Sequence, residues 1–271
     1  MPHHSIIIPH RNRWRRLRQC LRSLAESARV TGVQDYEALI VDQCSGDSGM
    51  ALAGVDVKAR LVSVSPPTDG GFNKCRLLNA GIELSDGEVL SFLDADAIIG
   101  PRWLEGVGAI LESQRLTRLC YRVRELPETI LDEMEAAAAW RDVYRRVFNC
   151  YDSGGWAKKY EAYTAPEYGV WEEANLPDNV GPHVFGNSQF SIRRDVLGDL
   201  RYDADKYPQA SYEDLDFIRR IARRYGKQYR AMILRNAAHA MFHIKSEREL
   251  DWHDKEQAAR QKERYLAESK Q

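Results

Sequence analysis

The chain has 271 residues, 44% of them hydrophobic, which is enough for a substantial core and excludes a disordered protein. Its net charge of -1 gives no support for a nucleic-acid partner. The first apolar run, Ile6 to Ile8, is too short for a signal peptide or membrane span. Five scattered cysteines without a Cys-x-x-Cys pair are typical of reduced thiols. We therefore expect a cytoplasmic protein without a membrane span, which leaves room for peripheral contact with the inner face of the membrane.

Hydrophobic periodicity predicts strands that alternate with helices in the first half of the chain. The predicted strands are 5–9, 37–42, 60–64, 89–93 and 118–123, and the predicted helices are 14–28 and 74–84. Such alternation implies a Rossmann-like α/β fold with a mainly parallel sheet flanked by helices. Ligands bind outside the carboxyl ends of the strands in such sheets, where Pro9, Asp42 and Asp94 to Asp96 fall.

The alternation breaks down in the second half. A helix is predicted over 129–147, and the segment 151–171 is rich in aromatics and glycine. That segment is either a lid over an acceptor site or an aromatic satellite core. Further strands are predicted over 184–193, 229–234 and 237–243, a helix from Glu213 to Ala222, and a charged terminal helix over 247–267.

Asp94-Ala95-Asp96 follows the apolar run 89–93 directly. Alternation along a strand points Asp94 and Asp96 to the same side, while Ala95 turns away. Two carboxylates there suit a divalent cation that bridges phosphates. Taken alone, Asp-x-Asp is more often an ordinary surface turn, so the pattern needs its context.

Several other charged residues near predicted strand ends have two readings. Arg11 and Arg13 suit a diphosphate clamp, whereas the arginines further along the helix read as a solvated basic face. Asp42 either accepts hydrogen bonds from a ribose or base, or caps a turn with Ser45. Glu213-Asp214 supplies either catalytic carboxylates or the acidic first turn that a helix dipole favours. The arginines of the basic face are Arg15, Arg16, Arg18 and Arg22.

Five segments stand in order along the chain. They are Ile6-Ile7-Ile8-Pro9-His10-Arg11-Asn12-Arg13, Phe72-Asn73-Lys74-Cys75-Arg76-Leu77-Leu78-Asn79-Ala80-Gly81, Asp94-Ala95-Asp96, Glu213-Asp214-Leu215-Asp216, and Met241-Phe242-His243 with Lys245. Together they resemble the GT-A glycosyltransferases, with the closest likeness to the β-1,4-galactosyltransferase type. The first half also resembles bacterial family-2 enzymes. The resemblance implies one continuous GT-A domain, with residues 1–124 as the nucleotide-sugar-binding half and 125–271 as the acceptor-binding and catalytic half.

The same resemblance implies a donor site and a metal site. Phe72 would stack on uracil, and Lys74 would approach a phosphate. Asp96 would be the main metal ligand, and His243 would complete the set of ligands that the protein supplies. Asp94 would contact the ribose, the metal or a metal-bound water. The donor-binding set is Pro9, Arg11, Arg13, Asp42, Phe72, Lys74, Asp94 and Ala95. An imidazole ligand favours Mn²⁺ over Mg²⁺, and His239 is the rival to His243.

The chemistry implied is transfer of a hexose or N-acetylhexosamine from a UDP-sugar to a hydroxyl of a glycan or glycolipid. Asp214 would be the general base and Glu213 would hold the acceptor or position Asp214, with inversion at the anomeric carbon. The chain departs from the galactosyltransferase pattern at Ala210-Ser211-Tyr212, where Trp-Gly-Gly would stand, so both sugars stay open. The alternatives are a sugar nucleotidyltransferase and a non-catalytic module that binds sugar nucleotides.

Overall fold

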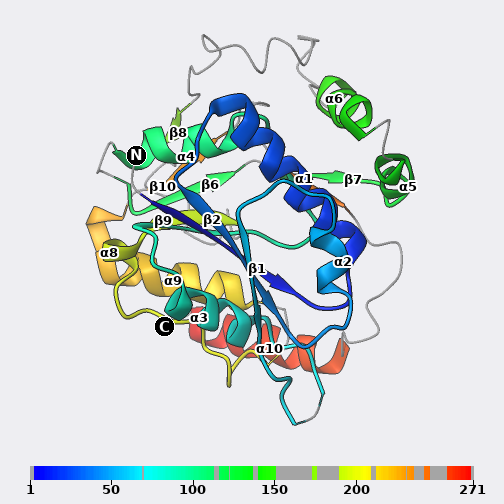
Figure 1. The fold of residues 1–271 in the computed structure, drawn as a ribbon. Coiled ribbons are helices and arrows are strands. Elements are labelled where there is room, and N and C mark those ends of the chain that lie inside the picture. The colour runs from blue at the N-terminus through cyan, green and yellow to red at the C-terminus, as the bar shows by residue number, and fades with distance from the viewer. Residues whose placement is uncertain are drawn as a thin grey trace.

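The computed structural model describes residues 3–68, 70–112, 116–121, 123–136, 140–150, 173–175, 189–208, 212–229, 231–234, 241–244 and 255–269. Within these residues, the central sheet has eight strands in the order β3-β2-β1-β4-β9-β6-β10-β8 (Figure 1). The strands are β1 (His4–His10), β2 (Tyr36–Asp42), β3 (Ala59–Ser63), β4 (Val89–Phe92), β6 (Arg118–Tyr121), β8 (Glu173–Asn175), β9 (Phe190–Arg193) and β10 (Ala231–Leu234). Only β8 and β9 run antiparallel to their neighbours in this described sheet. The predicted, mainly parallel sheet is confirmed.

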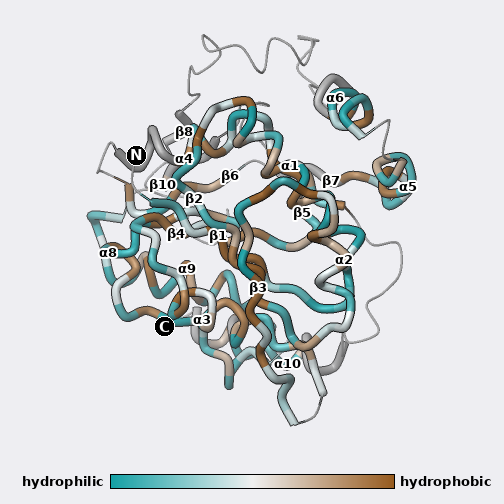
Figure 2. The backbone as a smooth tube through the Cα atoms, viewed as in Figure 1, coloured by the Kyte–Doolittle hydropathy of each residue, from teal (hydrophilic) through white to brown (hydrophobic). Residues whose placement is uncertain are grey.

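Helices cover both faces of this sheet (Figure 1). Ile6 and Ile8 of β1 pack with α1 and α4, while Ile7 faces the cluster formed with α3 and α9. A strand that is buried on both faces has a continuous apolar sequence. The central strands are accordingly coloured as hydrophobic in Figure 2. The helices are α1 (Trp14–Thr31), α2 (Ser48–Leu52), α3 (Lys74–Leu84), α4 (Trp103–Glu112), α8 (Arg194–Leu197), α9 (Glu213–Tyr225) and α10 (Lys255–Ser269), with a 3₁₀ turn, η3 (Gly226–Gln228). No helix among the described residues is long and apolar enough to cross a membrane.

A second, three-stranded sheet joins distant parts of the chain in the order β5-β11-β7. It is formed by β5 (Ala97–Ile99), β11 (Met241–Ile244) and β7 (Val123–Leu126), and α5 (Ile130–Glu135) and α6 (Trp140–Cys150) pack on it. The strand predicted over 118–123 is confirmed as β6, but its end is wrong, because β6 ends at Tyr121 and Val123 starts β7 in the other sheet. The helix predicted over 129–147 is also two helices, since α5 ends at Glu135 and Ala136 is extended. The aromatic segment 151–171 lies outside the described residues.

Other parts of the protein contact the arginine-rich face of α1. The prediction that this face is solvated is therefore wrong in part. Arg16 is only 6% exposed and donates to Glu128 at 2.5 Å. Arg22 donates to the carbonyl of Met134 at 3.1 Å, and Arg15 donates to Asp132 at 2.6 Å. The residues that lead into α5 and α5 itself supply these acceptors, which no local pattern within α1 could indicate.

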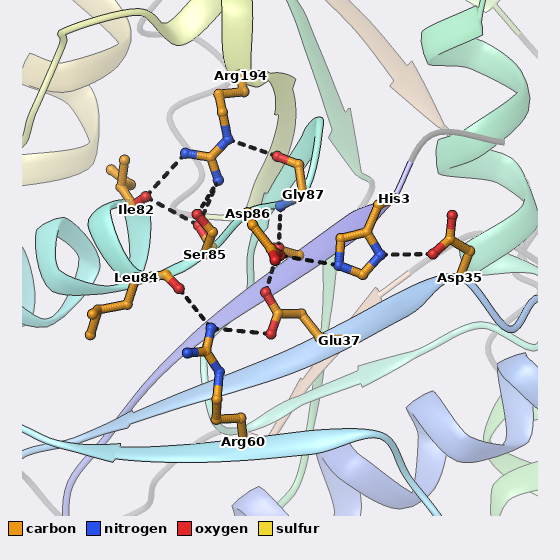
Figure 3. Close-up of polar contacts among 11 residues, drawn as sticks. His3, Asp35, Glu37, Arg60, Ile82, Leu84, Ser85, Asp86, Gly87 and Arg194 are labelled. Carbon is orange, nitrogen blue, oxygen red and sulfur yellow. Dashed lines mark hydrogen bonds and ion pairs between the residues drawn. The ribbon is translucent and has the colours of Figure 1, made fainter.

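The amino ends of the central strands are tied by a polar network on the side opposite to the carboxyl ends (Figure 3). Arg194 donates to the carbonyl oxygens of Ser85 and Gly87 at 2.7 and 2.8 Å, which fixes the turn before β4. Glu37 of β2 accepts from Ser5 of β1 at 2.7 Å. The network therefore stabilises the register of β1, β2 and β4. That register also sets the positions of the residues at the carboxyl ends of these strands.

Gly81 lets α3 approach β1 closely. A Cβ atom at Gly81 would lie 2.3 Å from Ile7 Cγ2, inside the core. We expect Gly81→Ala to lower the free energy of unfolding by about 1–3 kcal/mol, because the added methyl overpacks this contact. Urea denaturation measures the change. Gly49→Ala is the matched control: a Cβ at Gly49 meets nothing within 4 Å, so that variant should unfold at or above the wild-type midpoint.

Candidate active site

Asp94, Asp96 and His243 meet at the carboxyl end of β4. Each offers one ligand atom, and these atoms lie within 4.8 Å of one another. The register of β11 on β5 places His243 opposite Ala97, and Ile244 N donates to the carbonyl of Asp96 at 3.1 Å. β4 ends at Phe92, so the two carboxylates converge through a turn rather than by strand alternation as expected.

These residues fit a divalent cation. Asp96 Oδ1 is buried and receives no well-aligned hydrogen bond from the described residues, while His243 Nε2 lies 3.0 Å away. Neighbouring ligands of an octahedral ion stand about 3.0 Å apart when each bond is about 2.1 Å. An imidazole beside two carboxylates suits manganese and similar transition ions. His239, the predicted rival, lies outside the described residues.

Within the described residues, a second group of side chains could also supply metal ligands. His3, Glu37 and Asp86 approach at the amino ends of the strands, with ligand atoms within 4.8 Å. His3 is already paired with Asp35 at 2.8 Å and with Asp86 at 3.3 Å, and the Asp86 side chain is 84% exposed. The group around the buried Asp96 is less exposed than this one, and it is therefore the candidate metal centre.

Lys74 connects the Asp94 turn with the start of α9. Its ammonium lies 2.6 Å from Asp94 Oδ1 and 3.7 Å from Glu213 Oε1, and the Lys74 side chain is 10% exposed. Glu213 is buried, whereas Asp214 is half-buried and accepts a hydrogen bond from Leu215 N at 2.8 Å. The structure thus brings the predicted carboxylates Asp94, Glu213 and Asp214 around one amine.

Burial shapes the protonation of these groups. Desolvation raises the pKa of Glu213 to about 7 and raises the pKa of Asp214, although the charge of Lys74 opposes both shifts. Burial alone would lower the pKa of Lys74, but the charges of Asp94 and Glu213 raise it well above its ordinary value. Lys74 therefore stays an ammonium, and Glu213, with a pKa of about 7, can exchange a proton near neutral pH.

Asp96 also has arginine partners. Arg13 Nη1 lies 3.2 Å from Asp96 Oδ2, and Arg16 Nη1 lies 3.9 Å from the same atom. Arg13 was predicted to be on the donor side, and the described structure places it against the predicted metal ligand. Arg16 was predicted to be solvated, so its place beside Asp96 corrects that expectation.

The remaining predicted donor residues lie around the same edge. Pro9 is buried one residue before the end of β1, and Phe72 and Ala95 are 9% and 8% exposed. Arg11 is half-buried. Asp42 accepts from Ser45 N at 2.9 Å and pairs with His10 Nδ1 at 2.8 Å, which is the turn-capping arrangement that the sequence offered as one alternative.

Two residues outside the predicted donor-binding set also lie here. Gln189 donates to Asp94 Oδ2 at 3.3 Å from the start of β9. Gln43, at the end of β2, donates to Gly71 O at 2.6 Å and accepts from Asn73 N at 3.1 Å, which fixes the loop that carries Phe72. Both follow or precede strands, and that position was the only available indication.

The first half of the chain matches a known family, and solved structures share the fold. Residues 5–130 match the family described as glycosyl transferase family 2. TarS 1–349 of S. aureus in complex with UDP aligns over 90% of this chain and 60% of its own, at 17% identity and a TM-score of 0.57. The fold is that of the GT-A glycosyltransferases.

Alignments with other GT-A structures cover a similar share of this chain. The complex of TarS 1–349 with UDP-GlcNAc covers 91% of this chain and 59% of its own, at 17% identity and a TM-score of 0.56. Mannosyltransferase PcManGT of Pyrobaculum calidifontis, with GDP-Man and Mn²⁺, covers 93% and 59%, at 18% identity and a TM-score of 0.53. The chain thus spans about three fifths of these solved chains, and 37% of the longer solved chain of TarS. No curated protein matches it in sequence.

Proposed function

We propose that the protein is an inverting, metal-dependent glycosyltransferase that moves a hexose or N-acetylhexosamine from a UDP-sugar to a hydroxyl of a glycan or glycolipid. The observation that carries the proposal is the convergence of Asp94, Asp96 and His243 beside Lys74 and the Glu213-Asp214 pair. Solved neighbours of the same fold hold UDP, UDP-GlcNAc, or GDP-Man with Mn²⁺, which supports a sugar-nucleotide donor.

Asp96, His243 and Asp94 would hold the cation. When bound, a divalent ion supplies positive charge against the leaving diphosphate. Arg11 and Arg13, together with Lys74, add fixed positive charge at the same edge, where charge on the diphosphate grows as the sugar departs. Phe72 is the candidate platform for the base, and Pro9, Asp42 and Ala95 shape the rest of the donor side.

Asp214 is the candidate general base. It is half-buried at the first turn of α9, so an acceptor hydroxyl can reach it from solvent. Its raised pKa makes it a stronger base than an ordinary aspartate, while the charge of the Lys74 ammonium opposes that shift and favours the carboxylate form. Glu213, which is buried against Lys74, holds that amine and positions Asp214.

Titration calorimetry of UDP with and without Mn²⁺ tests the proposal. We expect Mn²⁺ to tighten UDP binding by about 5- to 150-fold, the usual range for two coupled ligands. Asp96→Asn should remove that gain, and GDP should bind more weakly than UDP. UDP binding that is indifferent to Mn²⁺ in the wild-type protein would contradict the donor-site assignment.

Hydrolysis of UDP-sugars in Mn²⁺ then separates the classes of function. Slow release of UDP from one sugar nucleotide supports a transferase, since water can replace the acceptor. Pyrophosphate release from UTP and a sugar 1-phosphate would instead support a nucleotidyltransferase. Metal-enhanced UDP binding without turnover of any UDP-sugar or acceptor would leave a non-catalytic binding module.

A further inference from the structure

His10 is a buried polar residue that the proposed reaction does not use. It is the last residue of β1, and only 1% of its surface is exposed. The register of β1 on β2 places it opposite Asp42, and its Nδ1 lies 2.8 Å from Asp42 Oδ1. Its own carbonyl oxygen accepts from Gln43 N at 3.0 Å. His10 therefore ties the carboxyl ends of two neighbouring strands to each other.

The other ring nitrogen of His10 fixes the loop that leads into α1. Arg13 N donates to His10 Nε2 at 3.2 Å, and between them Asn12 has a φ of 50°, which turns this N–H back towards the ring. Arg13 is the N-cap of α1 and makes no side-chain cap. The next N–H, that of Trp14, donates to Asp47 Oδ2 at 3.3 Å. Side chains from other segments therefore satisfy the N–H groups at the start of α1.

These two contacts need one particular tautomer of the His10 ring. A backbone N–H can only donate, so Nε2 accepts from Arg13 and carries no proton. The proton of the neutral ring is then on Nδ1, from which it is donated to Asp42. Ser45 stands beside this pair: its hydroxyl donates to Asp42 Oδ1, and its Oγ lies 3.2 Å from His10 Nδ1. The neutral ring with its proton on Nδ1 is the form that satisfies both contacts.

Both partners of His10 lead to the proposed donor side. Arg13 Nη1 lies 3.2 Å from Asp96 Oδ2, so the Arg13 backbone sets where a guanidinium meets the candidate metal centre. Asp42 directly precedes Gln43, which fixes the loop that carries the candidate platform for the base. The side chain of His10 is 0% exposed and cannot touch a donor itself. It can act on a donor only through these neighbours.

We propose that His10 is a positioning residue for the donor, an inference that rests on the proposed function. Through Nδ1 it holds Asp42 and the turn after β2 for the nucleoside. Through Nε2 it holds the loop 11–13 for the diphosphate and its ion. One buried side chain thus sets the spacing between the two parts of the donor site, and it raises affinity because neither loop has to be ordered when the donor binds.

Two variants separate the two contacts. In His10→Asn, the amide Nδ2 takes the place of Nδ1 and keeps the bond to Asp42, but no atom replaces Nε2. We expect this variant to bind uridine within about twofold of wild type and UDP with Mn²⁺ at least about fivefold more weakly, the effect of one buried group left unpaired. In His10→Gln, Oε1 reaches the place of Nε2, but no donor faces Asp42. This variant should lose at least about fivefold in both affinities. Calorimetry measures UDP, and competition against UDP measures the weaker uridine.

The tautomer of His10 gives a readout that does not depend on any donor. In ¹⁵N NMR spectra of the histidine-labelled wild type at about pH 8, where an ordinary histidine is neutral, His10 should be protonated on Nδ1. The spectrum of His10→Asn or His10→Gln identifies the signal by its loss. A neutral His10 ring protonated on Nε2 overturns the inference, and this test remains available if neither variant folds.

His3→Asn is the matched control. His3 lies just before β1 at the opposite end of the sheet, where its Nδ1 is 2.8 Å from Asp35 Oδ1 (Figure 3). Its loss should leave both affinities unchanged. Wild-type affinities in both His10 variants, or equal losses for uridine and UDP in His10→Asn, overturn the positioning role. The proposed function fails separately, if Mn²⁺ does not tighten the binding of UDP to the wild type.

Discussion

Asp214→Asn should lower the rate of sugar transfer by about 10²- to 10⁴-fold, the usual contribution of a positioned general base. Asparagine keeps the size of the side chain and can still accept the hydrogen bond from Leu215 N, so the start of α9 should persist. Binding of UDP with Mn²⁺ should stay within about twofold of wild type, because the lost interaction belongs to the transition state.

The pH profile gives this prediction a second readout. A base must be deprotonated, and desolvation raises the pKa of Asp214 above its ordinary value, so kcat/KM should fall as the pH drops through that raised pKa. This decrease of kcat/KM at low pH should be absent from the Asp214→Asn variant. Full activity of Asp214→Asn would remove Asp214 from its role.

Asp216→Asn is the control on the same helix. Asp216 is 2% exposed and accepts from Arg219 at 2.9 Å and Arg220 at 2.8 Å. Burial would raise its pKa, but the charges of Arg220 and Lys206 lower it, so the carboxylate stabilises the fold above its ordinary pKa. Asp216→Asn should therefore lower the unfolding midpoint while the folded fraction keeps its transfer rate.

The sequence predicts the first half of the fold well because that half is built from local patterns. The apolar run in β1 and the periodicity of α3 place these elements within about one residue of their observed bounds. The helix expected over 129–147 fails for a tertiary reason. Its alanines favour a helix, yet the chain turns at Ala136 so that α5 can reach α1 while Trp140 and Tyr144 of α6 pack on the second sheet.

The candidate site is harder to predict, because its members come from pairings that no local pattern contains. Asp96 and His243 meet only because β11 pairs with β5 across more than half the chain. The resemblance to a known family supplied that pair, whereas periodicity alone could not. The prediction for Arg16 was wrong because the pattern of a helical face does not indicate what packs on that face. Its partner Glu128 lies just before the helix predicted over 129–147, far from α1 in the sequence.

His243→Ala should weaken Mn²⁺ binding by at least about 10- to 100-fold, the range found even for residues that merely support a metal ligand. Burial alone would lower the pKa of His243, but the carboxylate of Asp96, whose Oδ1 lies 3.0 Å from Nε2, raises it above its ordinary value. A protonated imidazole cannot bind a metal, so the wild-type affinity should fall about tenfold per pH unit below that raised pKa. In the His243→Ala variant, the affinity for Mn²⁺ should not show this dependence on pH.

The cation-free protein should show the opposite dependence on pH. Because the folded-state pKa of His243 is raised, its pairing with Asp96 stabilises the fold fully below about pH 6.5 and less as the pH rises through the raised pKa. Thermal unfolding without metal should follow this trend in the wild type and lose it with His243→Ala. His239→Ala, made in parallel, decides between the two histidines: if it alone weakens Mn²⁺ binding, the ligand is His239, and unchanged affinity in both variants rejects histidine ligation.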